Sequence, residues 1–367
     1  MSGTSITIGI LTGGGDCPGL NAVIRAVTRR ALAAGAKVVG IEDGFLGLIE
    51  GRTRALTAAD VSGILAQGGT ILGASNRANP ARFARGTNPD GSPRFTDETD
   101  RAVETARRAG LDAIVAVGGD GTMEVSSAFL RRAKGLRIVG VPKTIDNDIL
   151  GTDVTFGFTT AVTTATEALD RVRTTAASHH RTMVVEVMGR YAGWIALHAG
   201  VAGGAEVILV PEIPYDPAII ARVVHARAND GKRHTIVCVA EGARPRGGAA
   251  TVARVDPTSP DPTRLGGIGR VLADQIELAT NVESRSIVLG HVQRGGPPVP
   301  FDRILGTRLG VHAVELLLRG ADARMAAIRG AAVTDVDLSV AASGQRLIGA
   351  DDELVRAARL TGVCFGD

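Results

Sequence analysis

Short runs of apolar residues recur along the 367-residue chain, and most of them are followed by polar, glycine-rich residues. Near the N-terminus, the run from Ile6 to Leu11 precedes a glycine-rich loop, and Leu20 to Ala34 then carries apolar residues at helical spacing. A second apolar run, Lys37 to Ile41, completes a strand–loop–helix–strand pattern. Continuous apolar strands of this kind are typical of a parallel sheet that is buried on both faces.

The same arrangement returns downstream. Further apolar runs cover residues 113–117, 136–141, 183–187, 207–210, 236–240 and 287–289, and a helix is predicted over 123–133. Alternating strands and helices over this length predict an α/β fold with two doubly wound, Rossmann-like domains. Because ligands bind beyond the carboxyl ends of strands in such sheets, we expect the active site between the two domains. Residues 79–99 and 242–261 are rich in Pro, Gly and charged residues and are predicted to be exposed loops.

Composition narrows the class of protein. Hydrophobic residues make up 44% and charged residues 22% of the chain, which is typical of a globular protein. The net charge of +3 is too small to indicate a nucleic-acid or membrane surface. The three cysteines provide no disulfide framework or zinc spacing, and no signal peptide or apolar run of membrane-spanning length is visible. We therefore expect a cytoplasmic protein without nucleic-acid or membrane partners.

Two glycine-rich loops are candidates for binding phosphate. The first, residues 13–19, offers backbone amides ahead of a helix, although a tight structural turn explains it equally well. It is neither a Walker A loop nor a clean dinucleotide fingerprint, since Pro18 replaces the third glycine. The second, residues 118–122, reads Gly-Gly-Asp-Gly-Thr, and its Asp120 can hold the Mg²⁺ that phosphoryl transfer needs. That motif also occurs in NAD kinases and lipid kinases, so it indicates a kinase without specifying which one.

A third polar segment, Thr144-Ile145-Asp146-Asn147-Asp148, places two carboxylates just beyond a predicted strand. One carboxylate can accept a proton while the other orients a metal ion. No further acidic residues follow at EF-hand spacing, which argues against a calcium loop.

Five segments in this order resemble the phosphofructokinase family. They are residues 11–21, 118–122, 142–148, 187–193 and 289–296, and the resemblance extends from about Ile8 to Leu318. It implies a 6-phosphofructokinase, which transfers a phosphoryl group to the 1-hydroxyl of fructose 6-phosphate. It also implies that residues 1–158 plus about 292–340 bind the phosphoryl donor, and that 159–291 plus about 341–367 bind the sugar phosphate.

The resemblance implies a role for each matched residue. Asp146 would be the general base, and Asp120 would hold Mg²⁺ with Asp148 in support. The donor would be bound by Gly14, Arg77, Gly119, Gly121 and Thr122. The match of Arg77 departs from the common family pattern, because the segment 73–77 is one residue longer.

Other matched residues would bind the sugar phosphate. They are Thr144, Asp146, Met188, Gly189, Arg190 and Glu241 for the sugar, and Arg181, Arg285, His291 and Arg294 for its 6-phosphate. In the family, the matches of Arg181 and Arg285 come from a neighbouring subunit. The resemblance therefore implies a homo-oligomer, expected to be a tetramer.

Two positions bear on the phosphoryl donor. An aspartate in place of Gly121 would exclude the α-phosphate of ATP, so Gly121 favours ATP, whereas Lys143 is the residue that pyrophosphate enzymes of the family keep. Steric and charge exclusion is the stronger effect, and we expect ATP with Mg²⁺, with pyrophosphate as the alternative donor. A kinase of another class and a non-catalytic sugar-phosphate sensor remain alternatives. The first leaves residues 144–148 and 291–296 unexplained, and the second leaves Asp120 and Asp146 without a role.

Overall fold

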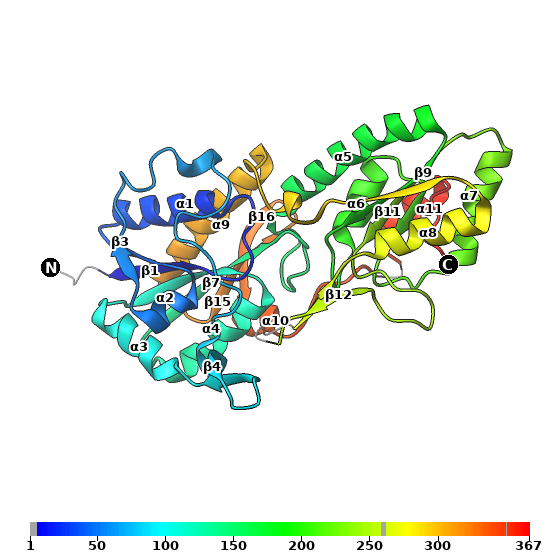
Figure 1. The fold of residues 1–367 in the computed structure, drawn as a ribbon. Coiled ribbons are helices and arrows are strands. Elements are labelled where there is room, and N and C mark those ends of the chain that lie inside the picture. The colour runs from blue at the N-terminus through cyan, green and yellow to red at the C-terminus, as the bar shows by residue number, and fades with distance from the viewer. Residues whose placement is uncertain (1–5, 258–261, 350) are drawn as a thin grey trace.

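The structure is a computed structural model that describes residues 6–257, 262–349 and 351–367. Two separate sheets, each flanked by helices, form its two ends (Figure 1). The predicted class, α/β with two doubly wound domains, is confirmed. In the part of the chain that the structure describes, none of the helices combines the length and apolar character needed to span a bilayer.

The larger sheet has the strand order β16-β15-β7-β6-β1-β2-β3. Its strands are β1 (Thr7–Thr12), β2 (Lys37–Ile41), β3 (Thr53–Ala55), β6 (Ala113–Gly118), β7 (Arg137–Thr144), β15 (Arg324–Arg329) and β16 (Ala332–Asp337), and β8 (Phe156–Gly157) pairs with the end of β7. The inner strands are parallel, and the two edge strands β3 and β16 are antiparallel to their neighbours.

Both faces of the larger sheet are buried. Along β6, Val115 and Val117 belong to one apolar cluster, while Ile114 and Ala116 belong to another on the opposite face. The flanking helices are α1 (Leu20–Ala33), α2 (Phe45–Glu50), α3 (Thr99–Arg108), α4 (Asp120–Arg132), α9 (Pro300–Leu318) and α10 (Leu338–Ala342). This burial explains why the strands read as unbroken apolar runs.

The smaller sheet has the order β10-β11-β9-β14, and all of its strands are parallel. The strands are β9 (Thr182–Val187), β10 (Val207–Leu209), β11 (Thr235–Ala240) and β14 (Ser284–Val288). The helices around it are α5 (Phe158–His179), α6 (Trp194–Ala202), α7 (Pro217–Asn229), α8 (Ile268–Thr280) and α11 (Glu353–Leu360). The chain reaches this sheet through α5, leaves it before α9, and returns to it after α10 (Figure 1).

Three local predictions were wrong. Helix α4 begins at Asp120 instead of 123, so the last three residues of the Gly-Gly-Asp-Gly-Thr motif lie in its first turn. The first predicted loop contains a hairpin of β4 (Phe83–Thr87) with β5 (Pro93–Thr96), and the second contains β12 (Val252–Val255), which pairs with β13 (Thr263–Leu265) just beyond the loop. Irregular register interrupts the alternation of both hairpins, which removes the strand signal from the sequence. Residues 258–261 of the second predicted loop lie outside the described residues.

The remaining ordered segments are single turns of 3₁₀ helix. They are η1 (Ile64–Ala66), η2 (Pro80–Arg82) and η3 (Gly290–Gln293). The last of these directly follows β14, so it lies at the same edge of the smaller sheet as the loops after β9 and β11.

Candidate active site

Glycine residues allow the two phosphate-loop candidates to pack together. The loops follow β1 and β6, which are adjacent parallel strands, and the side chain of Thr122 lies between them. A Cβ atom on Gly13 or Gly118 would lie 2.7 or 2.2 Å from Thr122 Oγ1, so neither position accepts a larger residue without a shift. In contrast, a Cβ on Gly121 would meet nothing within 4 Å. The structure therefore leaves open space at Gly121, the position expected to influence the choice of phosphoryl donor.

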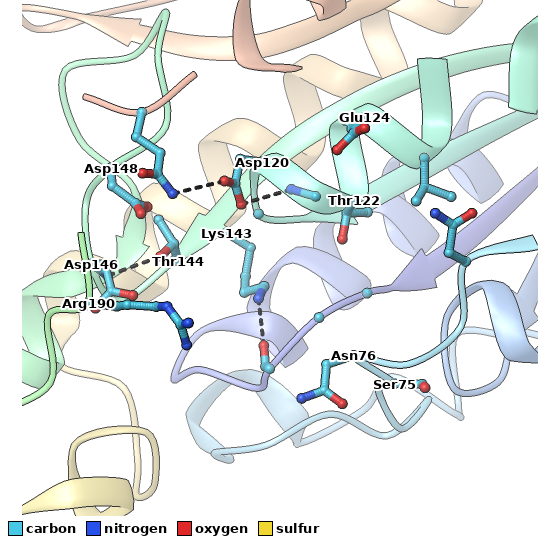
Figure 2. Close-up of a pocket in the computed structure, with 18 of the residues that line it drawn as sticks. Ser75, Asn76, Asp120, Thr122, Glu124, Lys143, Thr144, Asp146, Asp148 and Arg190 are labelled. Atoms are coloured by element: carbon cyan, nitrogen blue, oxygen red, sulfur yellow. Dashed lines mark hydrogen bonds between the residues drawn. The ribbon is translucent and has the colours of Figure 1, made fainter. Parts of the chain in front are cut away.

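The start of α4 faces this space. Its first residue, Asp120, is held by the backbone N–H of Gly121, which donates to Oδ1 (2.8 Å), and by Gln345 Nε2, which donates to Oδ2 (3.2 Å) (Figure 2). The unpaired amides and the dipole at a helix N-terminus favour anionic groups such as phosphate. The same turn thus offers both a carboxylate for a cation and amides for a phosphate.

The turn after β7 carries Asp146 and Asp148. Between them, Asn147 adopts a left-handed backbone conformation (φ 52°), and its side-chain oxygen accepts a hydrogen bond from Thr155 N (3.0 Å). Asparagine tolerates this conformation better than most residues. The turn is also braced by the hydroxyl of Thr144, which accepts from Asp146 N (3.0 Å).

Burial controls the electrostatics of these two carboxyl groups. It raises the pKa of Asp146, against the opposing influence of Arg294 and Lys143. Burial, together with Asp146 and Asp120, raises the pKa of Asp148 to about 7. Within the described residues, Asp146 Oδ1 is buried and has no hydrogen-bond partner. Such an oxygen is suited to accept a proton or hydrogen bond from a ligand.

Lys143 is buried at the end of β7, and its Nζ donates to the backbone carbonyl of Gly15 (Figure 2). Desolvation lowers the pKa of this lysine. The ammonium group therefore links the phosphate-loop candidate after β1 to the turn that carries Asp146.

The opposite wall comes from the smaller sheet. Met188 and Arg190 follow β9, Glu241 follows β11, and His291 and Arg294 lie in or next to η3. Arg190 Nη1 donates to Thr263 O (2.6 Å), and Arg294 Nη1 donates to Asp16 O (3.1 Å), so each arginine is fixed by a neighbouring segment. Burial, with an addition from Asp146, raises the pKa of Glu241 to about 7.

Two adjoining pockets lie between the walls. The first has a volume of about 590 Å³, and the predicted residues that line it are Gly14, Gly119, Asp120, Gly121, Thr122, Lys143, Thr144, Asp146, Asp148, Arg190 and Arg294. The second has a volume of about 1020 Å³ and is lined by the predicted residues Gly14, Arg77, Asp146, Met188, Arg190, Glu241, His291 and Arg294. Asp146 lines both pockets, which places its carboxyl group where a ligand of one pocket meets a ligand of the other.

Four predicted residues are placed differently. Arg181 and Arg285 line neither pocket of this chain and lie at the amino ends of β9 and β14. Both form ion pairs with Glu283, at 2.7 and 2.5 Å. Gly189 lines neither pocket, and its positive φ (139°) allows the backbone to turn after β9. Arg77 lines the second pocket and pairs with Asp256 of the β12–β13 hairpin (3.0 Å).

Several lining residues were missed by the reasoning from sequence. Phe45, Glu124, Val125 and Gln345 line the first pocket, and Arg254, Asp256 and Arg264 of the β12–β13 hairpin line the second. Glu124 and Val125 directly follow the Gly-Gly-Asp-Gly-Thr motif, so the helix periodicity of α4 was the available signal. The others come from segments without a recognisable motif.

The donor set fits a magnesium ion that is shared with a ligand. Among residues 6–257, 262–349 and 351–367, no group of three or more His, Cys, Asp or Glu side chains is arranged to hold a metal. Magnesium, however, is commonly bound by one or two carboxylates, with phosphate oxygens and waters completing its shell. Asp120 and Asp148 provide such carboxylates at the first pocket.

Comparisons with known proteins identify similar sequences and structures over most of the chain. A model of the phosphofructokinase family matches residues 7–317. The chain is 50% identical over 362 residues to a Clostridium perfringens protein named ATP-dependent 6-phosphofructokinase 2, with 98% of each chain covered. It is also 50% identical over 335 residues to an Amycolatopsis methanolica protein named pyrophosphate–fructose 6-phosphate 1-phosphotransferase, which covers 91% of this chain and 94% of that one. The crystal structure of Pichia pastoris phosphofructokinase in the T-state matches with a TM-score of 0.79 at 32% identity, over 94% of this chain and 38% of the other.

Proposed function

The chain belongs to the phosphofructokinase family, and from this premise we propose that it is an ATP-dependent 6-phosphofructokinase acting on fructose 6-phosphate. Its product would be fructose 1,6-bisphosphate, as in glycolysis. The observation that carries the proposal is the position of Asp146, which lines both pockets and presents a buried oxygen without a partner in the described chain.

In this proposal each of the two pockets binds a different substrate. The first holds the polyphosphate on Gly14, the residues 119–122 and Lys143, and the second holds the sugar phosphate on Met188, Glu241, His291 and Arg294. The arrangement of the sheets supports the predicted domains, since α9, β15 and β16 pack with the larger sheet and α11 with the smaller one.

Asp146 performs the proton transfer in the proposed reaction. Its carboxylate accepts the proton of the 1-hydroxyl, the sugar oxygen forms a bond to the terminal phosphorus, and the bond from that phosphorus to the ADP oxygen breaks. The α4 N-terminus and Lys143 stabilise the charge that develops on the leaving oxygen. Magnesium, held by Asp120 with Asp148, would neutralise the phosphate charge.

The shape of the first pocket favours ATP. Besides the open position at Gly121, its lining includes Phe45, Ala78 and Val125, which pack together in one apolar cluster. This apolar end suits a nucleoside, whereas pyrophosphate would need only the polar end. Lys143 favours the second candidate, a pyrophosphate-dependent enzyme, because its buried ammonium can stabilise a phosphate leaving group. Sequence identity does not separate the two, since relatives at 50% identity carry both names.

The proposed partners and location follow from the same premise. We propose a homotetramer in which Arg181 and Arg285 reach the sugar phosphate of a neighbouring subunit, and a cytoplasmic enzyme. The ion pairs of both arginines lie away from this chain's own pockets, which supports a role at another subunit.

A coupled assay with two donors tests the function. With fructose 6-phosphate saturating, we expect rapid formation of the bisphosphate with MgATP and at most a small fraction of that rate with magnesium pyrophosphate. Activity with pyrophosphate alone would replace the first candidate with the second. Binding of fructose 6-phosphate without turnover by either donor would favour the sugar-phosphate sensor.

A further inference from the structure

Besides the glycine-rich loops and the Asp-Asn-Asp turn, a segment near the C-terminal end of the chain lines the first pocket. Residues 343–349, here called the strap, connect α10 beside the larger sheet toward α11 beside the smaller one. Its Gln345 lines the pocket, and the amide Nε2 donates to Asp120 Oδ2 at 3.2 Å (Figure 2). The two residues are 225 positions apart in sequence, so this contact depends on the tertiary fold.

The strap is joined to the turn that carries both aspartates of the Asp-Asn-Asp segment. Gln345 forms an isolated antiparallel bridge with Ile149, and Arg346 N donates to Asp148 O (2.7 Å). The Arg346 side chain adds a bond from Nε to Asn147 O (3.3 Å). Gln345 therefore sits between two acidic segments, bonded through its backbone to one and through its amide to the other.

The smaller sheet's helices fix the strap from the other side. Trp194, the first residue of α6, donates from Nε1 to Arg346 O (2.9 Å), and the Arg346 guanidinium stacks 4.2 Å from the centre of its ring. Ile348 N donates to Glu212 Oε1 (3.0 Å). These contacts hold the backbone of the strap next to Gln345, so the position from which the Gln345 side chain extends is fixed.

The bond to Asp120 fixes the orientation of a carboxylate. The backbone N–H of Gly121 holds Oδ1, but that contact is local and leaves the second oxygen free to rotate about it. The amide of Gln345 holds this second oxygen without adding a charge to the site. Such outer partners commonly set the orientation and basicity of metal-binding carboxylates.

We propose that Gln345 is a positioning residue for phosphoryl transfer, which orients the Asp120 carboxylate toward the metal-bound donor phosphates. This inference rests on the proposed function for the identity of the donor complex. It adds a residue outside the family's five matched segments and beyond residue 317, where the family match ends.

The variants Gln345→Met and Gln345→Ala test the amide. Methionine keeps most of the side-chain volume but cannot donate a hydrogen bond, and alanine removes both. Leu347→Ala is the matched control, because Leu347 lies on the same strap with its side chain 50% exposed. Thermal unfolding of all three shows whether the strap remains folded.

The first measurement is Mn²⁺ binding by electron paramagnetic resonance in the presence of a non-hydrolysable analogue, AMP-PNP in one arm and imidodiphosphate in the other. Both Gln345 variants should bind Mn²⁺ roughly 10- to 100-fold more weakly than wild type in the arm that matches the true donor. The second measurement is steady-state kinetics. In both Gln345 variants, the Mg²⁺ concentration that gives half-maximal activity should rise, while the KM for fructose 6-phosphate stays within about twofold of the wild-type value. Leu347→Ala should match wild type in both.

Wild-type Mn²⁺ affinity in Gln345→Met would overturn the proposal, because it would show that side-chain volume, and not the amide donor, matters. Wild-type behaviour of both variants would overturn it as well. If the wild-type enzyme phosphorylates nothing with either donor, the proposed function fails. The Mn²⁺ comparison would still decide the role of Gln345.

Discussion

The donor half and the sugar-phosphate half of the site differ in what a single chain supplies. On the donor side, every predicted residue except Arg77 lines the first pocket of the same chain. On the sugar-phosphate side, two of the four predicted phosphate-binding residues, His291 and Arg294, line the second pocket, whereas Arg181 and Arg285 pair with Glu283 at the other end of their strands. The donor half is built within one chain, and in our proposal a neighbouring subunit completes the sugar-phosphate half.

The difference follows from strand direction. The two glycine-rich loops and the Asp-Asn-Asp turn follow the carboxyl ends of the adjacent parallel strands β1, β6 and β7, which necessarily meet at one edge. Arg181 and Arg285 stand at the amino ends of β9 and β14, so no motion of side chains alone brings them to the carboxyl edge of the same sheet. The comparison predicts that donor-side variants act within one subunit and that these arginines act between subunits.

The largest expected effect comes from Asp146→Asn, at the boundary between the two halves. Loss of the proton acceptor should lower kcat by roughly 10²–10⁴-fold, while the affinity for fructose 6-phosphate is largely kept. Single-turnover kinetics together with equilibrium binding of the sugar phosphate measure the two quantities separately. Near-normal turnover would remove Asp146 from its catalytic role.

Gly121→Asp tests the donor half. The new carboxylate would occupy the open space beside α4 and repel the donor phosphates, so kcat/KM for ATP should fall roughly 100-fold. The KM for fructose 6-phosphate should change little if the halves are separate. Gly121→Ala is the matched control, because a Cβ there meets nothing within 4 Å and adds no charge. Equal loss in both variants would show that backbone freedom, and not charge, matters at this position.

Arg285→Ala tests the sugar-phosphate half. Loss of a charged hydrogen bond to the 6-phosphate should raise the KM for fructose 6-phosphate about tenfold or more. The decisive experiment mixes Arg285→Ala with Asp146→Asn subunits after reversible dissociation. A hybrid site with a wild-type Asp146 from one subunit and a wild-type Arg285 from its neighbour should combine the wild-type kcat with the wild-type KM, a combination that neither variant has alone. Absence of recovery in verified hybrids would place Arg285 outside a shared site.

Glu241→Gln gives the smallest effect, a change in stability with pH. Burial raises the pKa of this carboxyl to about 7 in the fold, so the folded state retains the proton while the unfolded state releases it between about pH 4.5 and 7. Relative to the glutamine variant, the wild type should therefore lose stability as pH rises through this window, by on the order of 2 kcal/mol. Thermal unfolding of both proteins at pH 5 and pH 8.5 measures it. A constant difference in Tm at the two pH values would contradict the assignment.

The sequence was sufficient for the fold class and for most donor-side residues, because both depend on local order. A buried strand followed by a polar turn fixes where Asp120 and Asp146 lie relative to the sheet, whatever the rest of the chain does. It was not sufficient for the Asp120–Gln345 and Arg77–Asp256 contacts. These join segments separated by 225 and 179 residues, and neither Gln345 nor Asp256 belongs to a motif.

The hairpins illustrate a second limit. Residues 79–99 and 242–261 have the composition of loops, yet β12 pairs with β13, and Arg190 donates a hydrogen bond to Thr263 O of this hairpin. Arg254, Asp256 and Arg264 consequently line the second pocket although their segments were predicted to be exposed loops or carried no signal. The amino-acid composition of a segment indicates whether it is exposed to solvent, but it does not indicate which binding pocket the segment lines.

A crystal structure with fructose 6-phosphate, AMP-PNP and Mg²⁺ bound tests the central claim most directly. We expect one carboxylate oxygen of Asp146 at about 2.6–3.2 Å from the 1-hydroxyl oxygen of the sugar. In the same complex, Asp120 should contact the metal, and the terminal phosphate should lie in line with that hydroxyl. An Asp146 carboxylate turned away from the bound sugar, with another group on the 1-hydroxyl, would contradict the account.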